Sequence, residues 1–167
     1  MSRAIYVQAR ADHVASLASA APLSAIEELV WNALDADARE VRIDLVQNAL
    51  GGIDEIRVSD DGSGIDILRA EETFGSLGGS WKMAEGTTTR REHRRLHGRH
   101  GCGRFKAFVL GTHVAWRTTM QVSGNLLSYA LEGDASEPGV FHIEQTSPGP
   151  ATGTEVSITG VRATADS

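Results

Sequence analysis

The sequence contains a single cysteine, Cys102, so no disulfide can form within the chain of 167 residues. This scarcity is typical of a reducing compartment, and we expect a cytoplasmic protein. No stretch approaches the roughly 20 apolar residues that a membrane helix needs. The N-terminus also lacks the basic and then apolar pattern of a signal peptide, so the sequence gives no indication of a membrane or secreted protein.

Two common nucleotide-binding patterns are missing as well. There is no G-x-x-x-x-G-K-[ST] loop, and the glycine-rich loop at 98–103 does not follow a strand of a βαβ unit, as a dinucleotide fold requires. Prolines number only 4, whereas there are 18 glycines, with 41% hydrophobic and 23% charged residues. This composition and length predict one α/β-type domain over residues 1–167, with several glycine-dependent turns.

Positive charge is concentrated in one segment of an otherwise acidic chain. The segment from Arg90 to Lys106 holds seven basic residues and one acidic residue, which gives it a net charge of +6. Because the whole chain carries −6, the remainder carries −12. Such a segment attracts an anionic partner, either nucleic acid or the phosphates of a small ligand.

Periodicity predicts helices interleaved with strands and then a run of antiparallel strands. We expect helices over 11–20, 24–38, 66–73 and 104–110, and strands over 5–7, 40–45, 55–60, 112–120, 126–131, 140–145 and 154–159. This order favours an α+β fold, a two-layer sandwich with helices on one face of a mixed, mostly antiparallel sheet. The long irregular stretch at about 75–100 is typical of a lid over a functional site.

The helix at 24–38 combines an apolar stripe with a polar one. The spacing i, i+4, i+7 puts Glu28, Asn32 and Asp35 on one side, and we expect that side to face away from the core. Ser24 followed by Glu27 predicts a capping box at the start of the helix. On its own, the polar stripe is more typical of a solvated helix face than of a functional site.

The strand at 55–60 ends its inward-facing column in a carboxylate. Ile56, Val58 and Asp60 alternate with charged residues and point to one face. A buried carboxylate is unfavourable unless something hydrogen-bonds to it, so we expect Asp60 to look into a pocket. Gly62 and Gly64 follow and allow close approach of a ligand, although Asp-Gly-Ser-Gly is also a common turn.

A loop of the pattern G-x-x-G-x-G opens directly into a predicted helix at Gly98, Gly101 and Gly103. Glycines free the backbone N–H groups to face an anion, so phosphate is the expected ligand. Zinc is an alternative, because four potential metal ligands lie nearby, although they lack the paired spacing of a structural site: His93, His97, His100 and Cys102.

Four motifs occur in order along the chain: Glu28-x-x-x-Asn32-Ala-x-Asp35-Ala, Asp60-x-Gly62-x-Gly64, Gly98-x-x-Gly101-x-Gly103 and Gly153-Thr-Glu-Val156. In this order and approximate spacing they resemble the ATP-binding motifs of the superfamily that contains DNA gyrase B, the ninety-kilodalton heat-shock chaperone, histidine kinases and MutL. The resemblance spans nearly the whole chain and implies the Bergerat ATP-binding fold, with ATP and Mg²⁺ as ligands.

The resemblance also implies a role for each motif residue. Asn32 would coordinate Mg²⁺, and Glu28 would activate the water that attacks the γ-phosphate. Asp60 would accept the adenine amino hydrogen, with Thr154 in support. Gly62 and Gly64 would let the base lie against the backbone, while the loop residues Gly98, Gly101, Cys102 and Gly103 would wrap the phosphates. Lys106 or a lid arginine could add charge, a task that no family motif assigns.

Glu28 and the residues around Asn32 resemble the MutL and chaperone branches more than histidine kinases. This implies slow hydrolysis by this domain alone, lid closure, ATP-dependent dimerisation, and a following domain that supplies a phosphate-contacting lysine or arginine. Two alternatives stay open. One is a phosphotransfer domain of the histidine-kinase type, and the other is a nucleic-acid-binding module that uses the basic segment 90–106.

Overall fold

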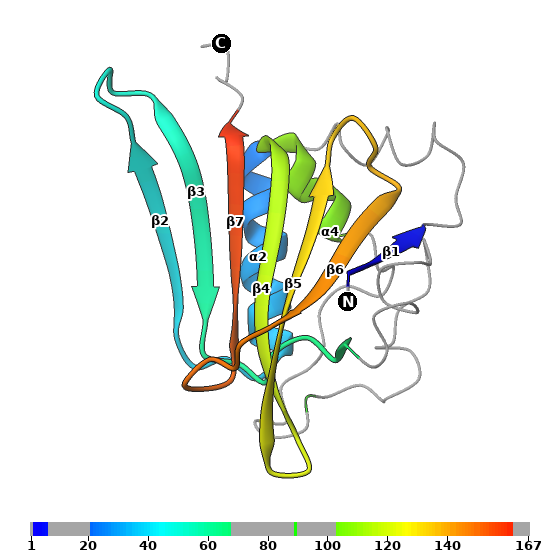
Figure 1. Ribbon diagram of the computed structural model, residues 1–167. Helices are drawn as coiled ribbons and strands as arrows, with labels where there is room; N and C mark the ends of the chain where they lie inside the picture. Colours follow the sequence, from blue (N-terminus) through cyan, green and yellow to red (C-terminus); the bar gives the residue numbers. More distant parts are fainter. Residues whose placement is uncertain (1, 7–20, 68–88, 90–102, 162–167) are drawn as a thin grey trace.

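The computed structural model describes residues 2–6, 21–67, 89 and 103–161, and the fold is defined by these parts of the chain. Seven strands form one open sheet in the order β1-β6-β5-β4-β7-β3-β2 (Figure 1). They are β1 Arg3–Tyr6, β2 Val41–Gln47, β3 Ile53–Asp60, β4 Gly111–Val122, β5 Asn125–Asp134, β6 Val140–Thr146 and β7 Gly153–Val161.

Every pair of neighbouring strands in the described sheet is antiparallel. The sequence predicts a mixed, mostly antiparallel sheet, so the structure narrows that expectation: the described strands contain no parallel pair. The α+β class is confirmed, with a helical layer on one face of the sheet. Because β3 and β7 are inner neighbours, the end of β3 is enclosed by strands on both sides.

The helical layer consists of α2 Pro22–Asp35, α4 Gly103–Lys106 and the 3-10 turn η3 Ala107–Val109. Figure 1 shows α2 running behind β7 and β4, with α4 beside it. The core joins this layer to the sheet through aromatic rings around Phe141. Ring centroids of Phe105 and Trp116 both lie 5.8 Å from that of Phe141, in edge-on geometry. None of the described helices has the length and apolar character needed to cross a membrane.

The start of α2 differs from the expected capping box. The helix begins at Pro22, its N-cap is Ala21, and no side chain caps it. Proline suits this first position because its ring fixes φ near the helical value and it has no N–H to leave unsatisfied. Ser24 and Glu27 therefore lie inside the first turns, and the predicted capping box is wrong.

The orientation of α2 also corrects the expectation that its polar stripe faces away from the core. The helix packs through a row of small and apolar residues, Ala25, Leu29 and Ala33, which are at most 4% exposed. Glu28 and Asn32 flank that row and are half-buried, and Asp35 is buried. The exposed side carries Leu23, Glu27 and Trp31. Two alanines let the helix approach the sheet closely, so the polar residues come to lie at its margin.

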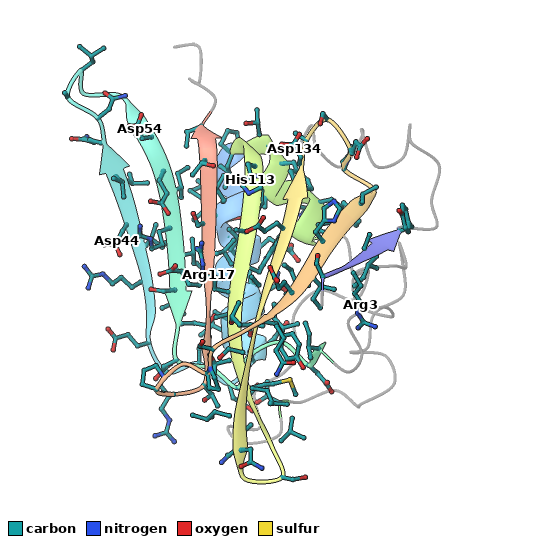
Figure 2. All side chains as sticks on the ribbon, in the orientation of Figure 1. Arg3, Asp44, Asp54, His113, Arg117 and Asp134 are labelled. Atoms are coloured by element: carbon teal, nitrogen blue, oxygen red, sulfur yellow. The ribbon has the colours of Figure 1, made fainter. Side chains whose placement is uncertain are left out.

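The face of the sheet opposite α2 is open and carries ion pairs across the strands. Arg57 Nη2 lies 2.8 Å from Glu55 Oε2, and Ser157 Oγ donates to Glu55 Oε1 at 2.6 Å. Glu155 lies 3.8 Å from both Arg57 and Arg117. Figure 2, seen from this face, labels Arg117 on β4. This polar network on the open face consists of Glu55, Arg57, Arg117, Glu155 and Ser157.

Several expectations lie outside the described residues. These are the helix at 11–20, the helix at 66–73 beyond Ile67, and the lid at 75–100 apart from Thr89. The helix expected at 104–110 is present as α4 followed by η3. All the strands expected from periodicity are present with shifted ends, which is the usual error of such boundaries.

Candidate functional site

Asp60 ends β3 on the face that the helices cover. Ile56 and Val58, four and two residues earlier, are 5% and 3% exposed, which confirms the predicted inward column. The Gly62 N–H donates to Asp60 Oδ1 at 2.8 Å, and the backbone N–H of Thr154 also donates to this carboxylate. Burial raises the pKa of Asp60, and the two hydrogen bonds offset that effect only in part. The neighbouring charge of Asp61 raises it further.

The loop after Asp60 is fastened to the end of α2. The Ser63 N–H donates to the carbonyl oxygen of Ala36 at 2.7 Å. Asp61 Oδ1 accepts from the backbone N–H groups of Arg39 and Glu40 at 2.7 and 2.8 Å. These bonds lower the pKa of Asp61, the one from Glu40 most. The loop therefore holds Asp60 at a fixed place beside the C-terminal end of α2.

Glycines in this region are required by close contact with backbone. Gly64 has φ +77°, and a Cβ there would collide with the carbonyl oxygen of Thr119. A Cβ on Gly62 would lie 2.7 Å from the Ala36 carbonyl oxygen, and one on Gly153 would strike the carbonyl oxygen of Asp60. The predicted glycines of two motifs thus pack where no side chain fits.

Thr118 joins the two motifs, and sequence reasoning missed it. Its side chain is on β4, 2% exposed, and its Oγ1 accepts the Ile65 N–H at 2.8 Å. The same oxygen lies 3.1 Å from Thr154 Oγ1 and 3.3 Å from the Gly153 carbonyl oxygen. One signal was available, since Thr118 is a hydroxyl between Trp116 and Met120 in an inward column of β4. A polar residue at such a position needs partners.

Glu28 and Asn32 lie one turn apart on α2, and both are half-buried. The Lys106 Nζ at the end of α4 lies 3.3 Å from Glu28 Oε2. Both side chains are largely shielded from solvent, 27% exposed for Lys106 and 20% for Glu28. The sequence singles out both residues but does not predict this contact, because they are 78 positions apart.

The structure thus brings together Asp60, Gly62, Gly64 and Thr154, and it sets Glu28 and Asn32 on the adjoining helix α2. Gly103 begins α4. The other predicted phosphate-loop residues, Gly98, Gly101 and Cys102, lie outside the described residues, as do the four candidate zinc ligands. Within the part of the chain that is described, no three His, Cys, Asp or Glu side chains gather as a metal site would require.

The fold is a sheet covered by helices on one face, and glycines and threonines pack around the carboxylate at the end of β3. This arrangement agrees with the ATPase class that the four motifs resemble. Residues 20–148 match the model of the family described as histidine kinase-, DNA gyrase B-, and HSP90-like ATPase. This match covers more than half of the chain, and the chain belongs to that family.

Shorter matches connect the chain to DNA mismatch repair protein MutL. It is 47% identical over 53 residues to MutL of Halalkalibacterium halodurans, which is 32% of this chain and 8% of that protein. It is 50% identical over 50 residues to MutL of Desulforudis audaxviator, 30% of this chain and 8% of the relative. It is 51% identical over 45 residues to MutL of Anaeromyxobacter sp., which is 27% of this chain and 7% of that protein. The matched segments therefore span less than a tenth of these relatives.

Proposed function

We propose that this domain binds ATP together with Mg²⁺ and hydrolyses it in the manner of the MutL and heat-shock-chaperone branches. The observation that carries the proposal is Asp60, a carboxylate on the covered face of an inner strand, held in place by the Gly62 and Thr154 N–H groups. An acceptor fixed in this way matches the amino group of adenine, because an acceptor rejects the carbonyl oxygen that guanine carries there. Family membership supports the same assignment.

In the proposed site, Asp60 accepts the adenine amino hydrogen and Thr154 supports that contact. Gly62 and Gly64 leave room for the base against the backbone. Gly98, Gly101, Cys102 and Gly103 would wrap the phosphates, and residues 75–100 would form the lid. We regard residues 1–167 as one cytoplasmic ATP-binding domain that closes its lid and dimerises when ATP binds, with a following domain that contributes a phosphate-contacting cation.

Glu28 and Asn32 present the chemistry that hydrolysis needs. An amide oxygen and a carboxylate one turn apart are hard oxygen donors, which fits Mg²⁺, and Asn32 would hold the ion. When bound, Mg²⁺ neutralises charge on the phosphates. Glu28 orients the attacking water and takes its proton, and the half-buried position of its side chain limits competition from bulk water.

The test combines calorimetry with a phosphate-release assay. We expect ATP with Mg²⁺ to bind, and Glu28→Gln to bind ATP within about twofold while hydrolysis falls on the order of 100-fold, the usual effect of losing a general base. Glu27→Gln is the matched control, since Glu27 lies on the exposed side of α2. Absence of ATP binding, or equal hydrolysis by Glu28→Gln and the unaltered chain, would refute the proposal.

Two other assignments have weaker support. Phosphotransfer of the histidine-kinase type would require a phosphoprotein, and we expect a labelled-phosphate assay to give free phosphate alone. Nucleic-acid binding would depend on the basic segment 90–106, of which Lys106 has a described side chain, and that ammonium is directed to Glu28. A salt-dependent shift of DNA or RNA that survives Asp60→Asn would favour this second assignment.

A further inference from the structure

Lys106 differs from an ordinary surface lysine, because the residues on both sides of it in the sequence are buried in the core. Phe105, Ala107 and Phe108 beside it are at most 1% exposed, so the backbone that carries Lys106 is anchored in the core. Phe105 packs edge-on against Phe141 at 5.8 Å. Of these four consecutive residues, Lys106 alone is not buried, and its side chain reaches α2.

Glu28 is carried by an equally fixed element. Its neighbour Leu29 is 4% exposed, and Ala25, one turn earlier, is fully buried. A glutamate has three rotatable side-chain bonds, so a rigid helix does not by itself fix where its carboxylate lies. The Lys106 ammonium contacts Oε2 at 3.3 Å, which restrains that freedom, and among the described residues the other oxygen, Oε1, remains for a water molecule.

We propose that Lys106 is a positioning residue for Glu28, one that orients the carboxylate of the proposed general base and does not contact the nucleotide. The inference rests on the proposed function, because it gives Lys106 a role only if Glu28 activates water. It differs from an ordinary surface ion pair, whose long side chains are solvated and contribute little. Here both partners are more than 70% shielded and extend from elements held in the core.

The position of Lys106 also links the base to the predicted phosphate loop. α4 begins at Gly103, the last glycine of the loop motif, and Lys106 ends the same helical turn. Any displacement of α4 would therefore shift the ammonium that holds Glu28. A misplacement of about 1 Å at a reacting group is sufficient to lower the rate on the order of 100-fold.

The experiment measures kcat and KM for ATP hydrolysis by the whole chain with Mg²⁺. We expect Lys106→Met to lower kcat about 10- to 100-fold with KM within about twofold, because orientation and not binding is lost. Lys106→Arg keeps the charge and should recover most of kcat. In a Glu28→Gln background, Lys106→Met should cause no further loss, since two residues that act through one group are not additive.

The matched control is Arg42→Met, which removes one positive charge from the exposed ion pair with Asp44 and should leave kcat and KM unchanged. If Lys106→Met does not fold, as judged by thermal unfolding, Lys106→Gln keeps a polar side chain and carries the same test. A raised KM with unchanged kcat would show that Lys106 contacts the nucleotide. A raised kcat, or additive losses with Glu28→Gln, would equally overturn the inference.

Failure of this inference can be distinguished from failure of the proposed function. If the unaltered chain neither binds nor hydrolyses ATP, the proposed function is wrong and the inference falls with it. If the unaltered chain hydrolyses ATP and Glu28→Gln does not, but Lys106→Met has the kcat of the unaltered chain, only the role of Lys106 is wrong.

Discussion

The two ends of β3 place carboxylates in opposite environments. Glu55 lies on the open face, where Ser157 Oγ donates to it at 2.6 Å and Arg57 Nη2 at 2.8 Å. Those contacts lower the pKa of Glu55, the Ser157 hydrogen bond most. Asp60, on the covered face, receives backbone N–H groups but no cation among the contacts that shift its pKa, which burial raises. The charged form of Glu55 is favoured by its partners, whereas burial disfavours the charged form of Asp60.

The largest expected effect is on stability, at two glycines that lie on either side of β3 in the sequence. Gly64→Ala places a methyl group against the Thr119 carbonyl at φ +77°, whereas Gly51, at the hairpin between β2 and β3, has φ +84° with open space around it. We expect Gly51→Ala to lower the free energy of unfolding by about 1 kcal/mol and Gly64→Ala by about 2–4 kcal/mol. Urea unfolding measures the free energy of unfolding of both variants. Equal losses would show that the loop around Gly64 is not tightly packed.

The next effect is on nucleotide binding. Asp60→Asn should weaken ATP binding roughly 10- to 150-fold, because a hydrogen bond to a charged group contributes about 1.5–3 kcal/mol. Glu55→Gln, on the same strand, should leave the dissociation constant within about twofold. Calorimetry with ATP and Mg²⁺ compares the two variants, and an equal loss in both would contradict the assignment of Asp60 to the adenine.

A smaller effect separates two adjacent threonines on opposite faces of β4. Thr118→Val removes the acceptor of the Ile65 N–H and leaves that donor without its bond, at a cost of about 1–3 kcal/mol. Thr119 Oγ1 lies on the open face, 2.6 Å from Ser128 Oγ, and Thr119→Val should cost less than about 1 kcal/mol. Thermal unfolding of both variants measures which substitution lowers the stability more. Thr118→Ser should restore much of the loss, and failure of that rescue would argue against a role for the hydroxyl.

The smallest effect is a pH dependence of opposite sign for the two carboxylates. Because the folded-state pKa of Asp60 is raised, its contribution to stability is present below the unfolded pKa, about 3.9, and decreases as the pH rises through the folded pKa. For Glu55, whose pKa is lowered, the contribution is present above about 4.3 and is lost as the pH falls. Urea unfolding of the unaltered chain, Asp60→Asn and Glu55→Gln between about pH 3 and pH 7 measures how the free energy of unfolding changes with pH. If the two substitutions changed this pH dependence in the same direction, the prediction would be contradicted.

Much of the fold could be predicted from the sequence. Alternation along residues 55–60 identifies β3, its inward column and the carboxylate at its end. That prediction is reliable because the period-two pattern of a strand depends only on neighbouring residues. The pattern predicts the apolar side of α2 correctly at Leu29 and Ala33, which are buried. It misses Ala25, whose burial places the core side of the helix so that Asp35 is buried as well.

The sequence by itself determined the α+β class, the family motifs and the place of Asp60 at a strand end. Only the tertiary structure decided that Thr118 holds Ile65 and Thr154, and that Lys106 contacts Glu28 across 78 positions. The physical reason is that periodicity and turn chemistry act between near neighbours. Contacts between distant residues arise only when strand order and helix packing bring them together.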